Sequence, residues 1–417
     1  MKEITGGVTA PLGFTAAGLH CGVKQSPLPD GNAPLAAPAA LKKDLALILS
    51  ETACAAAAVY TKNQVQAAPI HVSRTHLADG RARGIVANSG NANACAPLGL
   101  ENARRMAAAA ARATGLDPED FAVASTGVIG VTLNIEAIEV GIPQAAASLS
   151  KDGSADAGAA ILTTDLVTKE LAVSLELGGK TVTIGAIAKG SGMIHPNMGT
   201  MLCFCTTDCA IDASLLQKTL EQVVNKTFNR ITVDGDTSTN DTCFLLANGL
   251  AGNAPLQEGT PDYEAFCAAL HHIFRYEARK IAGDGEGASH LITCTVEGAA
   301  TEEKAEAMAK AVVGSSLVKA AIFGADANWG RVLCAIGYSG AHFDPEAVTV
   351  QFVSEAGEVT VCEGGRGLAF DEALAKEVLT PWEITILVTL TEGAAAATCW
   401  GCDLTYDYVK INGDYRS

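Results

Sequence analysis

Short apolar runs along the chain predict β-strands that are largely buried. Apolar residues either follow one another for roughly four to eight positions or alternate with polar ones, and alternation places them on one face of a strand. Two alternating runs, residues 171–177 and 182–188, flank a Gly-Gly pair at 178–179, which predicts a hairpin. The other expected strands are residues 45–49, 83–88, 121–125, 201–206, 290–296, 348–353, 384–390 and 396–404.

Helices are predicted where apolar residues recur every three or four positions. The clearest segment is 101–114, because it is rich in alanine and is followed by Gly115, a residue that commonly ends helices. Other helices are expected after the strand at 121–125 as far as about residue 149, and at 214–228, 263–281, 302 to about 321, and 371–379. Strands and helices alternate, so we predict an α/β (α+β) fold of mixed β-sheets sandwiched by helices. Residues 88–95 are expected as a loop, and residues 151–156 as a linker.

Residues 189–202 fit neither pattern and read Lys-Gly-Ser-Gly-Met-Ile-His-Pro-Asn-Met-Gly-Thr-Met-Leu. Gly190 and Gly192 interrupt an apolar strand, and Gly199 directly precedes Thr200, which opens the next strand. Glycine lets the backbone bend freely, so the Gly199 carbonyl can be reached by the threonine hydroxyl. Threonine can cleave its own amide and then act as an N-terminal nucleophile, with the freed α-amino group as base. On spacing alone, a glycine-rich turn before a strand remains the alternative.

This segment resembles the self-cleavage segment of the ornithine acetyltransferases, the glutamate N-acetyltransferase family of arginine biosynthesis. The family pattern K-G-S-G-M-I-x-P-N-M-A-T-M-L differs from the sequence only at Gly199, where the family has alanine. The runs Ala-Asn-Ser-Gly-Asn-Ala-Asn at 87–93 and Gly-Ala-Asp-Ala-Asn-Trp-Gly-Arg at 324–331 resemble the family as well. The resemblance implies the fold of the self-cleaving aminopeptidases and ornithine acetyltransferases, with a smaller C-terminal α+β subdomain at roughly residues 290–395.

The resemblance also implies an activity and a chain organisation. Cleavage between Gly199 and Thr200 would give an α chain of residues 1–199 and a β chain of residues 200–417 that stay associated, as an α2β2 heterotetramer. The acetyl group of N-acetyl-L-ornithine would pass to L-glutamate through an acetyl-Thr200 intermediate, which releases ornithine and forms N-acetylglutamate. No cofactor is expected. Some members also accept acetyl-CoA as a co-substrate, and the sequence does not separate the two kinds.

A strand that ends in Ser125-Thr126-Gly127 exposes a hydroxyl and an unhindered backbone N–H, two donors that can hold an oxyanion. As a bare pattern this is an ordinary turn, whereas the resemblance assigns the oxyanion hole to Thr126 and Gly127. The resemblance further implies that the substrate is held by Thr163, Lys189, Thr200, Glu286, Asn412 and Ser417.

Three of these binding residues have simple alternative interpretations. A lysine at a strand end, such as Lys189, is usually only solvated, and Glu286 lies in a glycine-rich acidic turn. The tail 411–417 would be disordered on composition alone. If these residues do bind substrate, Lys189 suits a carboxylate. Glu286 then suits either a side-chain ammonium or the amine of Thr200.

The formal net charge of −17 argues against nucleic acids and anionic membranes as partners, because both require clustered Lys and Arg. No apolar stretch is long enough to span a membrane, and the N-terminus lacks a secretory apolar region. The thirteen cysteines lie scattered in apolar runs, which predicts buried, reduced thiols in a cytoplasmic protein, with Cys203, Cys205 and Cys209 in the core.

Two segments have a weak resemblance to metal sites. Residues 231–241 place three acids among hydroxyls, as a cation-binding loop does, but lack the spacing of an EF-hand. Cys399 and Cys402 form a single C-x-x-C without further ligands. We therefore expect no metal.

Two other functions remain open at this point. A self-processing aminopeptidase or amidase of the same architecture would pass the acyl group to water, whereas a non-enzymatic amino-acid-binding protein would not cleave itself. The segments that begin at residues 88 and 231, together with the tail, favour the transferase.

Overall fold

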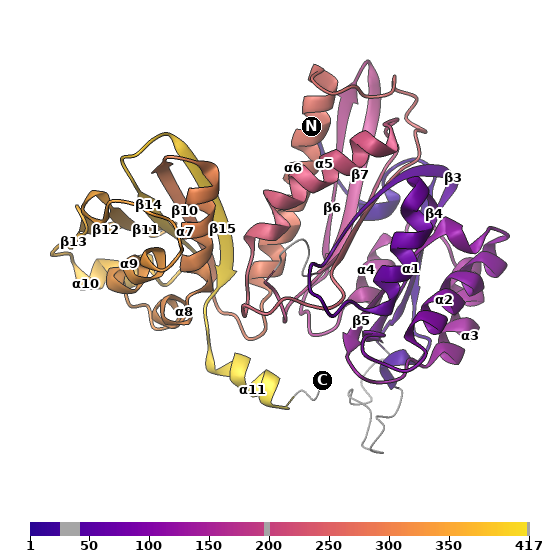
Figure 1. Cartoon of the computed structure of the whole chain (residues 1–417), viewed down its shortest axis with the longest axis horizontal. Helices are drawn as coiled ribbons and strands as arrows, with labels where there is room; N and C mark the ends of the chain where they lie inside the picture. Colours follow the sequence, from indigo (N-terminus) through magenta and orange to yellow (C-terminus); the bar gives the residue numbers. More distant parts are fainter. Residues whose placement is uncertain (26–41, 196–200, 415–417) are drawn as a thin grey trace.

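The computed structural model describes residues 1–25, 42–195 and 201–414, and its strands form two β-sheets (Figure 1). Both sheets combine parallel and antiparallel neighbours, and helices pack against both. This arrangement confirms the predicted α/β fold of mixed sheets and helices. Within the three ranges given above, none of the helices has both the length and the apolar character needed to cross a membrane.

The strands of the larger sheet are β1 (Lys2–Ile4), β2 (Phe14–Leu19), β3 (Leu45–Tyr60), β4 (Arg81–Asn91), β5 (Phe121–Val128), β6 (Lys169–Leu177), β7 (Lys180–Lys189), β8 (Leu202–Thr207) and β9 (Thr242–Ala247). In space they follow the order β1-β6-β7-β8-β9-β3-β4-β5, and β2 pairs with β3. Strands β6 and β7 form the predicted hairpin around Gly178 and Gly179, both of which have a positive φ. The prediction of a glycine turn at this position is confirmed.

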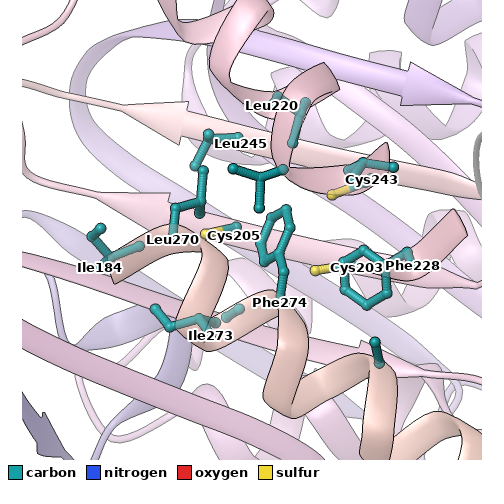
Figure 2. Packing of buried hydrophobic residues seen from close by; sticks show 14 of the residues in the cluster. Ile184, Cys203, Cys205, Leu220, Phe228, Cys243, Leu245, Leu270, Ile273 and Phe274 are labelled. Carbon is teal, nitrogen blue, oxygen red and sulfur yellow. The ribbon is translucent and has the colours of Figure 1, made fainter. Parts of the chain in front are cut away.

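Helices cover both faces of the larger sheet, namely α1 (Ala68–His76), α2 (Gly99–Thr114), α3 (Ile135–Ala147), α4 (Ser154–Ile161), α5 (Ala213–Asn225) and α6 (Pro261–Gly283). Alternation along β8 selects the face: Cys203 and Cys205 pack toward α5 and α6, whereas Leu202 and Phe204 pack with α4. Figure 2 shows the two cysteines beside Phe274 of α6. They are buried, free thiols that fill the core as small apolar side chains, as predicted.

The smaller sheet contains β10 (Leu291–Ala299), β11 (Thr349–Ser354), β12 (Gly357–Glu363), β13 (Arg366–Gly367), β14 (Glu383–Thr389) and β15 (Ala395–Cys402). Their order is β13-β12-β11-β14-β10-β15. Helix α7 (Glu302–Gly314) packs on β10 and β15, α10 (Glu372–Val378) packs on β11 and β12, and α8 (Ser316–Phe323) and α9 (Trp329–Gly337) pack on α7. The side chains between these elements form a hydrophobic core of their own.

Several contacts join the two sheets and their helices, and two of them lie near Arg230 and after β15. The Arg230 guanidinium donates hydrogen bonds to Glu302 and Glu306 on α7. After β15, helix α11 (Tyr406–Asp414) turns back toward the larger unit, as the yellow segment in Figure 1 shows. The Thr405 hydroxyl just before it donates to the Gly287 carbonyl at 2.7 Å. The alternative of a disordered tail is therefore wrong as far as Asp414.

Two predictions of chain organisation were wrong. The helix expected from 302 to about 321 is interrupted at Ser315, whose backbone is extended and whose hydroxyl accepts the Val318 N–H at the start of α8. The expected linker at 151–156 leads directly into α4. A Cβ on Gly153 would lie 1.8 Å from the Ala16 carbonyl oxygen, so this turn is packed on β2. It belongs to the core of the larger unit.

Several strands also differ from expectation. Strand β3 extends far beyond residues 45–49. Its second half was not predicted because it is an alanine-rich run, and alanine has little intrinsic preference for strands. Strand β4 continues through Asn91, so the expected loop at 88–95 begins on a strand. Strands β9, β12 and β13 were not expected. Of these, β12 pairs with β11 through a tight turn.

Candidate active site

A pocket of about 220 Å³ lies where the ends of β5 and β7 meet the start of β8. Pairing of β7 with β8 places Lys189 opposite Leu202, so both ends of the segment between these strands lie at the pocket. Segments far apart in the sequence contribute its wall: Ala92, Thr126, Gly127, Ile129, Thr163, Thr164, Lys189, Gly190, Gly192, Met193, Ile194, Met201, Leu202, Ser238, Thr239, Asn240, Asp241, Glu286 and Asn412.

Thr126 and Gly127 lie at a β-bulge between β4 and β5. The register shifts there, so that Asn91 lies opposite both Thr126 and Val128. Gly127 has a φ of 133°, and a Cβ on it would lie 2.3 Å from the carbonyl carbon of Gly90. A side chain at position 127 would therefore displace backbone. A bulge re-aims the residues that it contains, which explains why Thr126 and Gly127 line the pocket.

Lys189 ends β7 and lines the pocket, although only 7% of the residue is exposed. Its Nζ donates to Thr163 Oγ1 at 2.9 Å and to Thr126 Oγ1 at 3.3 Å. Burial lowers the pKa of Lys189, and the Asp165 carboxylate, 3.9 Å away, opposes this effect. The alternative of a solvated lysine is therefore wrong. Among the described residues that line the pocket, Lys189 is the one lysine or arginine.

Glu286 lies where three segments meet. Its Oε2 accepts a hydrogen bond from Asn412 Nδ2 on α11 at 2.8 Å, and its backbone N–H donates to the Ser191 carbonyl at 3.0 Å. A Cβ on Gly192 would approach the Glu286 carboxylate to 2.5 Å. The acidic turn is thus half-buried and held on two sides, rather than freely solvated.

The polar run at 231–241 supports the pocket through hydrogen bonds. The Asp234 carboxylate accepts the N–H groups of Met193 and Ile194 at 2.6 and 2.8 Å. The Asn240 amide donates to the carbonyls of Ala92 and Ser125, which connects two other walls. In the described part of the chain, no group of three His, Cys, Asp or Glu side chains is placed to hold a metal ion.

The two cysteines of the C-x-x-C have separate environments. Cys399 Sγ lies 3.8 Å from the carbonyl oxygen of Glu306, and Cys402 Sγ lies 3.5 Å from Lys319 Nζ. Both are buried free thiols.

The structure brings together six of the predicted site residues: Thr126, Gly127, Thr163, Lys189, Glu286 and Asn412. Gly199, Thr200 and Ser417 lie outside the described residues. Met201, directly after Thr200 in the sequence, lines the pocket. The roles of all nine residues stay predictions.

Sequence reasoning did not single out Asp165, Asp234 or Asn240 as individual residues of the site. Each stands in a polar run next to a strand or helix, and such runs usually form solvated turns. Their partners lie far away in the sequence, so neither spacing nor periodicity could have identified them.

The two-sheet α/β fold contains a pocket that combines an ammonium, a carboxylate and a Thr-Gly pair at a bulge, groups that suit a small charged molecule. The chain belongs to the ArgJ family, whose model matches residues 32–417. This confirms the family predicted from the segment 189–202.

Individual relatives match along the whole chain. The sequence is 53% identical over 418 aligned positions to the "Arginine biosynthesis bifunctional protein ArgJ" of Symbiobacterium thermophilum, which covers 100% of both chains. The protein of the same name from Bacillus subtilis is 46% identical over 420 positions, covering 100% of this chain and 98% of the relative. A crystal structure of the "Arginine biosynthesis bifunctional protein argJ" from Bacillus halodurans has a TM-score of 0.50 and 46% identity, and covers 52% of this chain and 100% of the solved chain.

Proposed function

We propose that this enzyme of the ArgJ family transfers the acetyl group of N-acetyl-L-ornithine to L-glutamate in arginine biosynthesis. Full-length relatives named for arginine biosynthesis support the pathway and favour the transferase over the amidase. The observation that carries the proposal is the single pocket shared by six residues from distant segments, namely Thr126, Gly127, Thr163, Lys189, Glu286 and Asn412.

The pocket offers a partner for each charge of N-acetyl-L-ornithine. Lys189 suits the α-carboxylate, because its ammonium is held by two hydroxyls and is mostly removed from water. The Glu286 carboxylate suits the side-chain ammonium of N-acetylornithine. Asn412 holds one oxygen of Glu286 and thereby limits the positions that the carboxylate can take.

The acetyl group would be carried by Thr200. Its α-amino group takes the hydroxyl proton while Oγ attacks the acetyl carbonyl, and the Thr126 hydroxyl and the Gly127 N–H hold the oxyanion. Because Thr126 Oγ1 accepts a hydrogen bond from Lys189, its own hydrogen remains available to donate. The tetrahedral intermediate then collapses: the α-ammonium of Thr200 returns the proton to the leaving nitrogen, the C–N bond breaks, ornithine is released, and acetyl-Thr200 remains. The amine of glutamate then attacks this ester, which forms N-acetylglutamate and restores the hydroxyl. The threonine ester itself carries the acetyl group, so the proposed reaction uses no cofactor.

We further propose cleavage at Gly199–Thr200 into an α chain of 1–199 and a β chain of 200–417, assembled as α2β2. Strand β7 of the first part pairs with β8 of the second, and β3 pairs with β9, so ladder hydrogen bonds and a shared core would hold the two chains together. The solved relative from Bacillus halodurans supports cleavage, since its complete chain covers only 52% of this one.

The test is an initial-rate study with N-acetylornithine and glutamate as varied substrates. An acetyl-enzyme between two half-reactions gives parallel double-reciprocal lines, whereas intersecting lines would rule out this intermediate. Mass spectrometry after mixing with N-acetylornithine alone should find one acetyl group on the fragment that begins at Thr200.

Two further assays distinguish the transferase from the related amidase and test acetyl-CoA as a donor. An amidase would release ornithine and acetate without glutamate, whereas the proposed transferase needs glutamate for turnover. Because the relatives are named bifunctional, acetyl-CoA is the second donor to be assayed with glutamate. A binding protein without catalysis would show none of these products.

A further inference from the structure

A buried ion cluster lies directly behind the pocket. Lys169 Nζ lies 2.8 Å from Asp165 Oδ1 and 2.6 Å from Asp284 Oδ2, and it also donates to the Val167 carbonyl at 3.3 Å. The side chains of Lys169 and Asp165 are fully buried, and that of Asp284 is 7% exposed. All three protons of the ammonium therefore have acceptors. None of these three charged residues lines the pocket.

The cluster connects the backbone segments that carry the proposed binding residues. Asp165 accepts the N–H of Thr163 at 3.1 Å and the N–H of Gly190 at 2.6 Å. Asp284 accepts the N–H of Leu166 through Oδ2 at 3.1 Å. The cluster thus links the segment that follows Lys189 to the turn that carries Glu286.

A second chain of bonds leads from the cluster to Glu286. The Ser191 hydroxyl donates to the backbone carbonyl of Asp284 at 2.6 Å, and the Ser191 carbonyl accepts the Glu286 N–H at 3.0 Å. These hydrogen bonds join uncharged groups, so a substitution can remove one of them without changing the ion pairs.

Asp165 also faces Lys189 directly, at 3.9 Å from Oδ2 to Nζ. Burial would raise the pKa of the Asp165 carboxyl, but the two lysines and the Gly190 N–H outweigh burial and hold that pKa far below its usual range. The carboxylate is therefore ionised at any working pH. The charged groups that act electrostatically on the Lys189 ammonium are Asp165, Lys169, Asp241, Glu286 and Lys24.

We propose that Asp165 is a positioning residue that keeps the Lys189 ammonium charged and placed for the substrate carboxylate, while Lys169 and Asp284 hold Asp165 in position. This inference rests on the proposed function for the identity of the ligand. Among the facing carboxylates of the described residues, Asp165 is the one within ion-pair distance of Lys189 Nζ. The Asp165 carboxylate also accepts hydrogen bonds from Lys169 and from two backbone N–H groups. It cannot turn away from Lys189 without breaking those bonds.

Two charge-changing substitutions should act in opposite directions. Asp165→Asn removes the negative charge behind Lys189, so Lys189 should lose its proton at lower pH than in the wild type. Lys169→Met removes a repelling positive charge, so Lys189 should keep its proton to higher pH. Ser191→Ala is the matched control, because it cuts the bond to Asp284 without changing any charge.

The experiment measures KM for N-acetylornithine and glutamate between roughly pH 6 and 8, where the substrates keep their own charges. In Asp165→Asn, KM should rise with pH by up to about tenfold per unit above the Lys189 midpoint and approach the wild-type value at low pH. In Lys169→Met it should show no such rise. In Ser191→Ala any increase in KM should be the same at every pH.

A direct titration separates this inference from the proposed function. The Cε signal of Lys189, assigned by its loss in Lys189→Arg, is followed against pH by NMR of lysine-labelled protein. Midpoints that shift in opposite directions in Asp165→Asn and Lys169→Met support the proposal even if the assayed substrates are wrong. Unchanged midpoints in an active enzyme would overturn it and leave the transferase intact. If Asp165→Asn fails to fold, the Lys189 midpoint in Lys169→Met compared with that in Ser191→Ala still decides, because a purely structural role predicts the same midpoint for both.

Discussion

The side-chain amide of Asn412 donates a hydrogen bond to Glu286 Oε2 at 2.8 Å, which joins the last helix of the chain to the turn that precedes the smaller sheet. The same amide donates to the Tyr408 carbonyl at 3.0 Å, so its orientation is set by α11. Both side chains line the pocket. The final helix therefore forms one wall of the candidate active site.

Deleting residues 412–417 should raise KM for both N-acetylornithine and glutamate. The proposed self-cleavage should survive, since it requires Thr200, its oxyanion donors and the Gly199 carbonyl, and the truncated chain keeps the bond between Thr405 and Gly287. Asn412→Ala alone should cost about 1–3 kcal/mol of binding, because Glu286 loses a partner. If the truncated enzyme has unchanged kinetics, the tail does not take part in substrate binding. If the truncated chain fails to cleave, the tail is needed for folding.

The purified wild-type protein should run on a denaturing gel as two fragments of nearly equal length, and Thr200→Ala as one full-length chain. The threonine hydroxyl is the only proposed nucleophile for the Gly199–Thr200 bond, so its removal should stop processing. Gly199→Ala restores the family residue and is expected to cleave at least as fast. An intact wild-type chain with full transferase activity would contradict the N-terminal-nucleophile scheme.

Thr126→Ala should lower kcat much more than it raises KM, because the oxyanion exists only in the transition state. One such donor contributes on the order of 2.7–4 kcal/mol, or about a hundredfold or more in rate. Thr126→Ser is the control, since it keeps the hydroxyl that accepts from Lys189. If both variants lose activity equally, the threonine methyl group rather than the hydroxyl matters.

Gly192→Ala should raise KM by displacing Glu286, because the added Cβ would lie 2.5 Å from the carboxylate. The fold should be retained, since the atoms to be moved belong to one side chain. Gly337→Ala is the matched control, as a Cβ there meets nothing within 4 Å. KM for N-acetylornithine is the measurement, and an unchanged value would show that the position of Glu286 does not affect binding.

Glu277→Gln should stabilise the protein, and more so at higher pH. Both carboxyl oxygens of Glu277 are buried without a hydrogen bond among the described residues, and burial raises the pKa of the group well above its usual value. The folded state then binds a proton that the unfolded chain releases above about pH 4.3, so wild-type stability falls as pH rises from there toward the folded pKa. Glutamine does not titrate in this range, so the variant should not lose stability in this way as the pH rises.

The gain in unfolding free energy from Glu277→Gln should increase by at most about 1.4 kcal/mol per pH unit. Denaturant unfolding at two pH values, in the uncleaved Thr200→Ala background, gives a unimolecular transition for this comparison. Exposed Glu355→Gln provides the control. A gain that is equal at both pH values would mean that Glu277 is ionised in the folded protein.

The sequence by itself determined the elements whose signal is local. The hairpin of β6 and β7 could be predicted because a Gly-Gly turn and alternating side chains are properties of neighbouring residues. Helix α2 likewise ends at Gly115, where φ is positive. The segment 189–202 identified the family because its residues are consecutive.

Other features depended on contacts between distant residues, and only the tertiary structure decided them. The turn before α4 looked like a linker until its packing against Ala16 was seen. A solvated Lys189 stayed open as an alternative until its strand was placed in the sheet. The connection of Asp165 through Lys169 to Asp284 joins the two halves of the chain. Periodicity reports which face of an element is apolar, but not which distant charge lies against it. That choice is made when the elements pack and water is excluded, since buried charges must then find partners.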